Sequence, residues 1–329
     1  MLGSVVIEEQ NFDWTRWPRS CRDWYNGVAF RGRGQHFRIE ASPGTNVQRY
    51  SISFGEPYLL NTDISWDISG VYYERFYDEW YEKRLGGQTS LGYRFHKDLV
   101  GYLTFRGYNI HLYHPITPTP PELADALGSN ALYGLGAKLV YDKRDSPYMA
   151  TEGWFMSAEV EQVFGSYTYP RAAFSVKKFI PLYERPDGSG RHVLSLKTSV
   201  DWTDVDTPIY EHYFTGGIST IRGFRYRKAT VRDMGVPVGG YTQVLACAEY
   251  LFPITADDMV KGVIFCDTGT SDYNFGSWKD RYRASVGFGF RITVPMMGSV
   301  PIALDFAFPV SKNDFDETEI FSFTMGGMF

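Results

Sequence analysis

The chain has 329 residues, 43% of them hydrophobic, so it is long and apolar enough for two ordinary folded domains or one large β-barrel. Its net charge of −5, with 33 basic and 38 acidic residues mixed along the sequence, argues against nucleic acid as the main partner. Aromatic residues make up 17%, and no apolar run approaches the roughly 20 residues of a spanning helix, which excludes a helical membrane protein but not an aromatic-rich β protein or membrane β-barrel.

The beginning of the chain lacks the basic start and apolar core of a secretory signal. The chain is therefore either cytosolic or a fragment of a longer exported precursor. Residues 13–34 depart from the alternation found elsewhere, because they combine Trp14, Trp17, Trp24 and Tyr25 with several arginines. This composition predicts either a short helix or coil at a membrane interface or a packed plug.

Alternation of apolar and polar residues dominates the rest of the chain. In residues 281–294 the even positions are apolar and the odd positions are polar or small. This segment exceeds the about 5–6 residues of an ordinary strand and fits the about 9–11 residues of a tilted membrane strand. The same alternation recurs in 154–164, 193–202 and 301–308, with charges on the polar face. A soluble sandwich would expose that face to water, whereas a barrel would turn it to the lumen; aromatic residues at strand ends favour the barrel.

The pattern predicts an all-β chain of about fifteen antiparallel strands in one domain, residues 1–329. Connections alternate roughly between short and long, which is typical of outer-membrane barrels. No linker, low-complexity segment or further repeat divides the chain. The predicted strands lie near 3–11, 35–43, 47–56, 62–74, 87–96, 99–112, 131–141, 153–164, 170–180, 192–203, 241–252, 259–269, 281–294, 301–308 and 319–329.

One long connection, 213–233, has the sequence YFTGGISTIRGFRYRKATVRD. It is too rich in glycine for a helix, and it surrounds Arg222 with glycines that permit a tightly folded loop. It also carries the apolar residues Ile218, Ile221 and Phe224, which a solvated loop would not need. Composition alone leaves two readings open: a loop tucked into the protein, or a surface loop with a solvated arginine.

Two carboxylates could receive Arg222. Glu249 and Asp267 lie on two neighbouring predicted strands that follow the loop, at the alternating positions whose side chains face the lumen. A shielded guanidinium–carboxylate pair is stronger than a surface ion pair. The alternative is three separately solvated charges.

Signals for enzymatic chemistry are weak. The chain lacks GxSxG, HExxH, Walker and GxGxxG motifs, and its six histidines lack metal-ligand spacing, so no catalytic residue, metal or cofactor is expected. Cys21, Cys247 and Cys266 form no CxxC pair. Cys247 has lumen-facing parity and Cys266 has the opposite parity, so no disulfide is expected between them.

Several stretches resemble the bacterial surface antigen superfamily, the outer-membrane assembly barrels of the BamA/TamA type. The resemblance extends over nearly the whole chain, its motifs follow in the right order, and the chain ends on Phe329. The stretches are FTGG at 214–217 with IRGF at 221–224, YDKRDSPYMATEGW at 141–154, AEYLFPI at 248–254, FCDTG at 265–269 and GFGFRITVPMMGSVPIALDFAFP at 287–309.

The resemblance implies a sixteen-stranded transmembrane barrel in the outer membrane of a Gram-negative cell, with the arginine loop folded into the lumen. It implies assembly and insertion of β-barrel clients through a lateral seam between the first and last strands; the alternatives are a polypeptide-secretion translocator or a passive pore. The implied partners are outer-membrane lipid, unfolded clients and possible periplasmic or lipoprotein subunits. The residues implied in locking the loop are Arg222, Gly223, Phe224, Glu249, Phe265, Asp267 and Gly269.

The chain departs from the family pattern in two respects. The periplasmic repeats that normally precede the barrel are absent, and about fifteen strands are counted where an even number is usual. Residues 4–14, SVVIEEQNFDW, resemble the second strand of the family. The hypothesis is that the first strand, the repeats and a signal peptide lie upstream of Met1.

Overall fold

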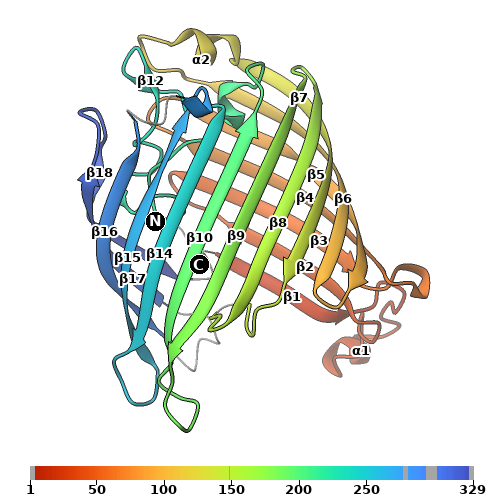
Figure 1. The fold of residues 1–329 in the computed structure, drawn as a ribbon. Helices are drawn as coiled ribbons and strands as arrows, with labels where there is room; N and C mark the ends of the chain where they lie inside the picture. Colours follow the sequence, from red (N-terminus) through yellow and green to blue (C-terminus); the bar gives the residue numbers. More distant parts are fainter. Residues whose placement is uncertain (1–3, 148, 277–280, 294–301, 326–329) are drawn as a thin grey trace. The chain divides into compact units, whose positions relative to one another are not determined.

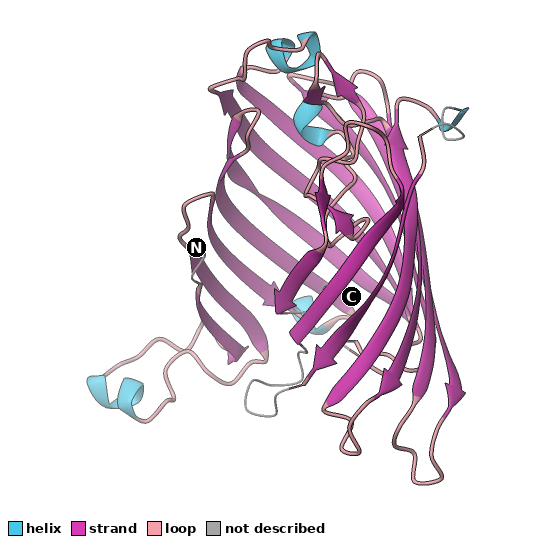
Figure 2. Ribbon diagram, turned by 90° about the vertical axis from the view of Figure 1, so that its left-hand side faces the viewer, coloured by secondary structure: helices cyan, strands magenta, loops and turns pink. Residues whose placement is uncertain are grey.

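The computed structural model describes residues 4–147, 149–276, 281–293 and 302–325. Strands dominate and the helices are short (Figures 1 and 2). Fifteen strands form one antiparallel sheet in which sequence neighbours are hydrogen-bonded; its order is β1 to β10, then β14 to β17, then β19, and β1 and β19 stand at the two ends. This confirms the all-β fold class and the expected fifteen strands. Among the described residues, no helix is both long and apolar enough to cross a membrane.

The chain divides into two compact units, Met1–Leu139 with Val160–Thr168, and Val140–Glu159 with Tyr169–Phe329. The described part of the first unit contains two short α-helices, α1 and α2, and one turn of 3-10 helix, Leu59–Asn61, and β7 and β8 have residues in both units. The elements that begin in the first unit are β1 (Val5–Phe12), α1 (Cys21–Tyr25), β2 (Gln35–Ser42), β3 (Val47–Glu56), β4 (Ile64–Phe76), β5 (Tyr81–His96), β6 (Leu99–Tyr113), α2 (Pro121–Asp125) and β7 (Gly128–Asp142).

The second unit holds the remaining long strands and four two-residue strands. The short strands form two ribbons, β11 with β18 and β12 with β13. The long strands are β8 (Gly153–Gly165), β9 (Tyr169–Tyr183), β10 (His192–Thr203), β14 (Thr242–Pro253), β15 (Val260–Asp272), β16 (Arg283–Ile292), β17 (Ile302–Ser311) and β19 (Phe321–Met325); the short ones are β11 (Gly223–Phe224), β12 (Arg232–Asp233), β13 (Val236–Pro237) and β18 (Thr318–Glu319).

Charged and apolar side chains are distributed over the two faces of the sheet in the reverse of the arrangement in a soluble protein. On β16, Arg283 and Arg291 are buried, whereas the alternating Val286 and Phe288 are 42% and 47% exposed. On β17, Asp305 is 1% exposed, while the apolar side chains of the other face are partly open. Charges inside and large apolar side chains outside fit a barrel wall in lipid. The soluble-sandwich alternative is therefore wrong.

Most strand boundaries agree with the predictions to within a few residues, and the main exception is β5. It was predicted to begin at residue 87 and begins at Tyr81. Gly86 and Gly87 both lie within the strand. A Cβ atom on Gly86 would collide with the carbonyl oxygen of Gly107 on β6, so the glycine permits close approach of two backbones. Parts of the predicted strands at 281–294, 301–308 and 319–329 lie outside the described residues.

The segment 13–34 is not a packed plug. Trp17, Trp24 and Tyr25 are 69%, 63% and 92% exposed, and α1 buries no residue. The alternative of a short helix or coil is consistent with α1, which extends beyond the end of β1 (Figure 1).

Candidate functional site

The connection between β10 and β14 folds back on itself and anchors apolar side chains. Gly216 and Gly223 have φ values of 106° and 91°, a region of backbone space that favours glycine. A Cβ atom on Gly223 would lie 3.1 Å from the carbonyl oxygen of Ala307, so the loop also approaches the wall closely at this point. Ile221 and Phe224 are 0% and 1% exposed and pack with two further buried side chains. The tucked loop is therefore correct, and the solvated surface loop is wrong.

Arg222 lies at the centre of this loop and is held by acids on the wall. Its Nε and Nη2 donate to the two carboxylate oxygens of Asp267 at 2.7 and 2.8 Å, a bidentate pair. Its Nη1 donates to Glu249 Oε1 at 2.7 Å. The guanidinium carbon lies 3.5 Å from the ring centroid of Phe265, so a cation–π contact covers one face of the group. Sequence reasoning proposed both carboxylates, and the structure brings them together.

Two further charged residues complete this network, and sequence reasoning did not include them. Asp305 accepts from Arg222 Nη1 at 3.2 Å and from Arg291 Nη1 at 2.6 Å. Arg291 Nη2 also donates to Glu249 at 3.1 Å. The signal was present in part, because the alternation of 281–294 and 301–308 placed Arg291 and Asp305 on the polar face. Alternation does not give the register between neighbouring strands, so the contacts of these two residues could not be predicted.

The other residues of the predicted lock surround this network. Phe265 is 3% exposed and lies on β15 beneath Arg222. Gly269 lies two positions beyond Asp267 on the same strand, where a Cβ atom would press against Leu245. Leu245 belongs to the apolar cluster that holds Ile221 and Phe224. The seven residues named from the sequence therefore lie on the loop or the wall it contacts, and their role as a lock is proposed below.

A second set of contacts joins the loop to the connection before β19. β11 pairs with β18, with Gly223 opposite Glu319 and Phe224 opposite Thr318. The ladder continues with the amide of Arg225, which donates to the carbonyl of Glu317 at 2.9 Å. The side chain of Arg225 also forms an ion pair with Glu317 at 3.0 Å. Sequence reasoning missed this link.

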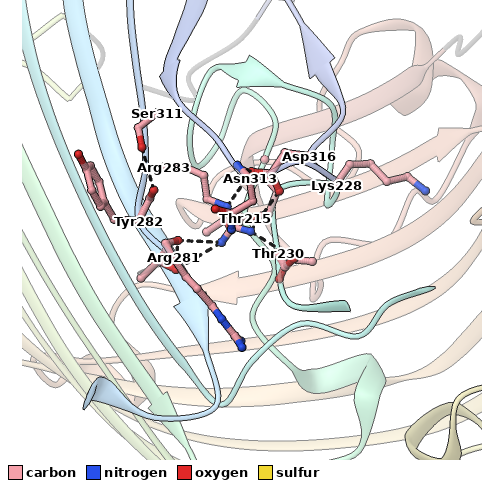
Figure 3. Close-up of polar contacts among 12 residues, drawn as sticks. Thr215, Lys228, Thr230, Arg281, Tyr282, Arg283, Ser311, Asn313 and Asp316 are labelled. Atoms are coloured by element: carbon pink, nitrogen blue, oxygen red, sulfur yellow. Dashed lines mark hydrogen bonds and ion pairs between the residues drawn. The ribbon is translucent and has the colours of Figure 1, made fainter. Parts of the chain in front are cut away.

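Arg283 on β16 connects the same parts of the molecule (Figure 3). It forms an ion pair with Asp316 at 3.0 Å, and both side chains are 2% exposed. It also donates to the carbonyl of Thr230, within the loop, at 3.3 Å. One buried guanidinium therefore ties the wall to the loop and to the connection before the last strand.

The three cysteines are free. Cys247 lies opposite Asp267, and its sulfur is 3.4 Å from Arg222 Nη2, on the inner face. Cys266 is exposed on the other face. The predicted opposite orientation of these two thiols is confirmed. Within the described residues, no group of three His, Cys, Asp or Glu side chains is arranged to hold a metal ion.

Comparisons with known proteins agree on one family. Residues 29–329 match the model of the Omp85 superfamily domain. A curated relative, the outer membrane protein assembly factor BamA of Nitratidesulfovibrio vulgaris, is 24% identical over 313 residues, which cover 91% of this chain and 38% of that protein. The chain therefore spans well under half the length of this relative.

Solved structures show the same fold. BamA from Haemophilus ducreyi lacking POTRA domains 1–3 superposes with a TM-score of 0.75 at 20% identity, covering 91% of this chain and 65% of that one. CdiB from Acinetobacter baumannii has a TM-score of 0.60 at 11% identity, covering 88% and 53% of the two chains. CdiB from Escherichia coli has the same TM-score and identity, covering 98% and 61%. The chain belongs to the Omp85 superfamily and is a β-barrel protein of the Gram-negative outer membrane.

Proposed function

We propose that this chain is the barrel of an assembly factor that folds and inserts β-barrel clients into the outer membrane. Clients would enter through a lateral seam between the first and last strands, where strand addition supplies main-chain hydrogen bonds without breaking a covalent bond. The partners would be unfolded outer-membrane proteins, lipid and periplasmic or lipoprotein accessory subunits. The likeness to BamA supports this role, since its TM-score of 0.75 exceeds the 0.60 of both CdiB structures.

The observation that carries the proposal is the buried Arg222 network. Five charged side chains from the loop and four strands meet there, and Arg222, Asp267 and Asp305 are 7%, 3% and 1% exposed. Removing one partner of a buried ion pair typically costs about 3–5 kcal/mol, because the remaining charges stay buried without compensation. The arginine would therefore lock the loop inside and keep β14 to β17 in a defined arrangement beside the last strand.

Reconstitution tests the insertion function. The chain is placed in lipid vesicles, a urea-unfolded outer-membrane barrel is added, and its folded fraction is followed by its shifted gel mobility. We expect faster client folding than in empty vesicles, and a loss of most of the acceleration in R222A. R225A is the comparison variant on the same loop: it removes an ion pair with Glu317 whose side chains are 53% and 40% exposed, so it should have a much smaller effect than loss of the buried arginine. Equal folding in empty and protein-containing vesicles would contradict the proposal.

A polypeptide-secretion translocator is the alternative within the superfamily, and the CdiB structures favour it. A passive pore is the other alternative. Single-channel conductance separates the pore from a locked barrel: R222A should change the conductance or its fluctuations if the loop is released, whereas a plain pore should respond equally to R222A and R225A. Transfer of an added passenger polypeptide into the vesicle, with no folding of barrel clients, would favour the translocator.

A further inference from the structure

The segment between β1 and β2, residues 13–34, forms an excursion that the proposed function does not use. It contains five arginines and two aspartates in a chain whose net charge is negative. It leaves the sheet at the end of β1, carries α1, and returns at the start of β2 (Figures 1 and 2). In the same unit, the connections 57–63 and 97–98 lie at the same rim of the antiparallel sheet.

Aromatic rings connect the excursion to the apolar wall. Trp17 and Trp24 both pack edge-on against Phe30, with centroid distances of 5.1 and 5.6 Å. Phe30 stacks on Phe12 at 5.7 Å, and Phe12 stacks on Phe37 of β2 at 4.9 Å. The excursion's aromatic cluster is therefore continuous with the first strands of the sheet.

The face that receives this cluster is the outer face of the sheet. Phe37 and Ile39 lie on the same side of β2, because strand side chains alternate. Ile39 pairs with Ile52 of β3, and these two side chains are 39% and 51% exposed. In an outer-membrane barrel this apolar face contacts lipid, so the exposed Trp17 and Trp24 lie where the lipid-facing wall ends.

Four of the five arginines of the excursion divide into two groups; the fifth, Arg16, donates from Nη1 to the carbonyl oxygen of Arg31 at 3.0 Å. Arg31 and Arg33, whose side chains are about half exposed, form ion pairs with Glu9 at 2.5 Å and with Glu56 at 3.8 Å. Arg19 precedes α1 and Arg22 lies within it; both are exposed, and neither side chain forms an ion pair within the described part of the chain. Asp23, whose carboxylate accepts from the backbone amides of Arg19 and Ser20, offsets part of this charge, and the two guanidinium groups still leave a net positive charge beside the exposed tryptophans.

We propose that this excursion docks on the membrane surface and binds the anionic headgroups of phospholipids. Tryptophan prefers the interface between hydrocarbon and water, and a basic side chain near an anionic bilayer contributes about 1 kcal/mol. Guanidinium groups pair with phosphate oxygens in a bidentate manner. The rings would lie at the edge of the hydrocarbon, with Arg19 and Arg22 among the phosphates above them.

Cys21, the exposed first residue of α1, provides the position for a probe. A nitroxide is attached to Cys21 in a Cys266→Ser background, because Cys266 is also exposed. The Cys21→Ser/Cys266→Ser protein keeps only Cys247, so the label it takes up shows how much attaches at that position. The chain is reconstituted in nanodiscs of phosphatidylcholine alone or with added phosphatidylglycerol. The ratio of collision rates with oxygen and with a water-soluble nickel chelate reports the depth of the label.

We expect phosphatidylglycerol to raise this ratio severalfold for the wild-type excursion and leave it unchanged for R19Q/R22Q. R94Q/K97Q is the matched control and should respond like wild type, because it removes two exposed positive charges from the same rim outside the excursion. W17S/W24S should leave the label in water in both bilayers. Two results would overturn the proposal: a wild-type label equally accessible in both lipid compositions, or a response to phosphatidylglycerol that R19Q/R22Q and R94Q/K97Q lose to the same extent.

Discussion

At the residue scale, the lock could be predicted in part because period-two alternation fixes which face a side chain occupies. Glu249 and Asp267 share the inward face, and the glycines around Arg222 allowed a folded loop. Alternation does not show how neighbouring strands are aligned along their length. Asp305 could therefore be assigned to the inner face, but its contact with Arg222, 83 residues away in sequence, required the register of the sheet.

Replacing Arg222 by lysine should destabilise the chain even though the charge is kept. A guanidinium presents a planar fork that binds Asp267 bidentately while it reaches Glu249 and Asp305, whereas an ammonium is a single point charge. We expect R222K to lower the free energy of unfolding in lipid vesicles by about 2–4 kcal/mol. R225K should change it by less than about 0.5 kcal/mol. Equal stability of R222K and wild type would show that the bidentate geometry is not needed.

Glu317 should make the attachment of the loop depend on pH. Burial alone would raise the pKa of this carboxyl, but hydrogen bonds from Arg225 and Arg232 outweigh burial and hold the pKa below its usual value. A carboxyl with a lowered folded pKa contributes stability above its unfolded pKa, and loses it as the pH falls through the folded pKa. The attachment should therefore be complete near neutral pH and weaken below about pH 4.5.

Hydrogen exchange of the segment 204–241 measures this effect, if E317Q is compared with wild type at each pH so that the intrinsic pH dependence of exchange cancels. We expect E317Q to exchange faster than wild type at neutral pH, by at most about fivefold, because the pair is partly exposed. The ratio should approach one in acid. A ratio that stays constant with pH would exclude Glu317 as the titrating group.

At the element scale, the long strands were predictable and the two-residue ribbons were not. Long strands repeat their alternation often enough to be recognised, whereas β11 and β18 offer two residues each. The early start of β5 was missed for a different reason. The alternation cannot be followed through Gly86 and Gly87, which have no side chain, yet Gly86 lies where the backbone of β6 leaves no room for one.

The β11–β18 ribbon predicts a specific cross-link. Arg225 follows Phe224, and Glu317 precedes Thr318. The two residues join through an amide–carbonyl hydrogen bond of 2.9 Å, so they lie opposite each other in the antiparallel ribbon. R225C/E317C should form a disulfide under mild oxidation, visible as a change in gel mobility on reduction. Its yield should fall severalfold when R222A is added, because the loop is no longer held. An unchanged yield would mean that the ribbon holds the loop without the arginine network.

At the scale of the whole molecule, inverted polarity identifies the environment of the outer face. Ile264, in the middle of β15, is 55% exposed, and Val205, in the connection after β10, is 64% exposed. If water covered both, an arginine at either site would be nearly neutral. On a lipid-facing strand, an arginine near the bilayer midplane costs about 2–4 kcal/mol. Exposure alone cannot distinguish these sites, but their positions in the fold can.

I264R should therefore be strongly destabilised in lipid vesicles and V205R should not. Reversible urea unfolding, followed by gel mobility and tryptophan fluorescence, gives both free energies. I264A separates loss of side-chain volume from introduction of charge. It should destabilise the protein much less than I264R does, because a methyl group remains compatible with lipid. In a detergent with a thin, deformable apolar belt, the penalty for I264R should shrink. Equal stability of I264R and V205R in vesicles would place this face of β15 in water and remove the basis for the seam and headgroup proposals together.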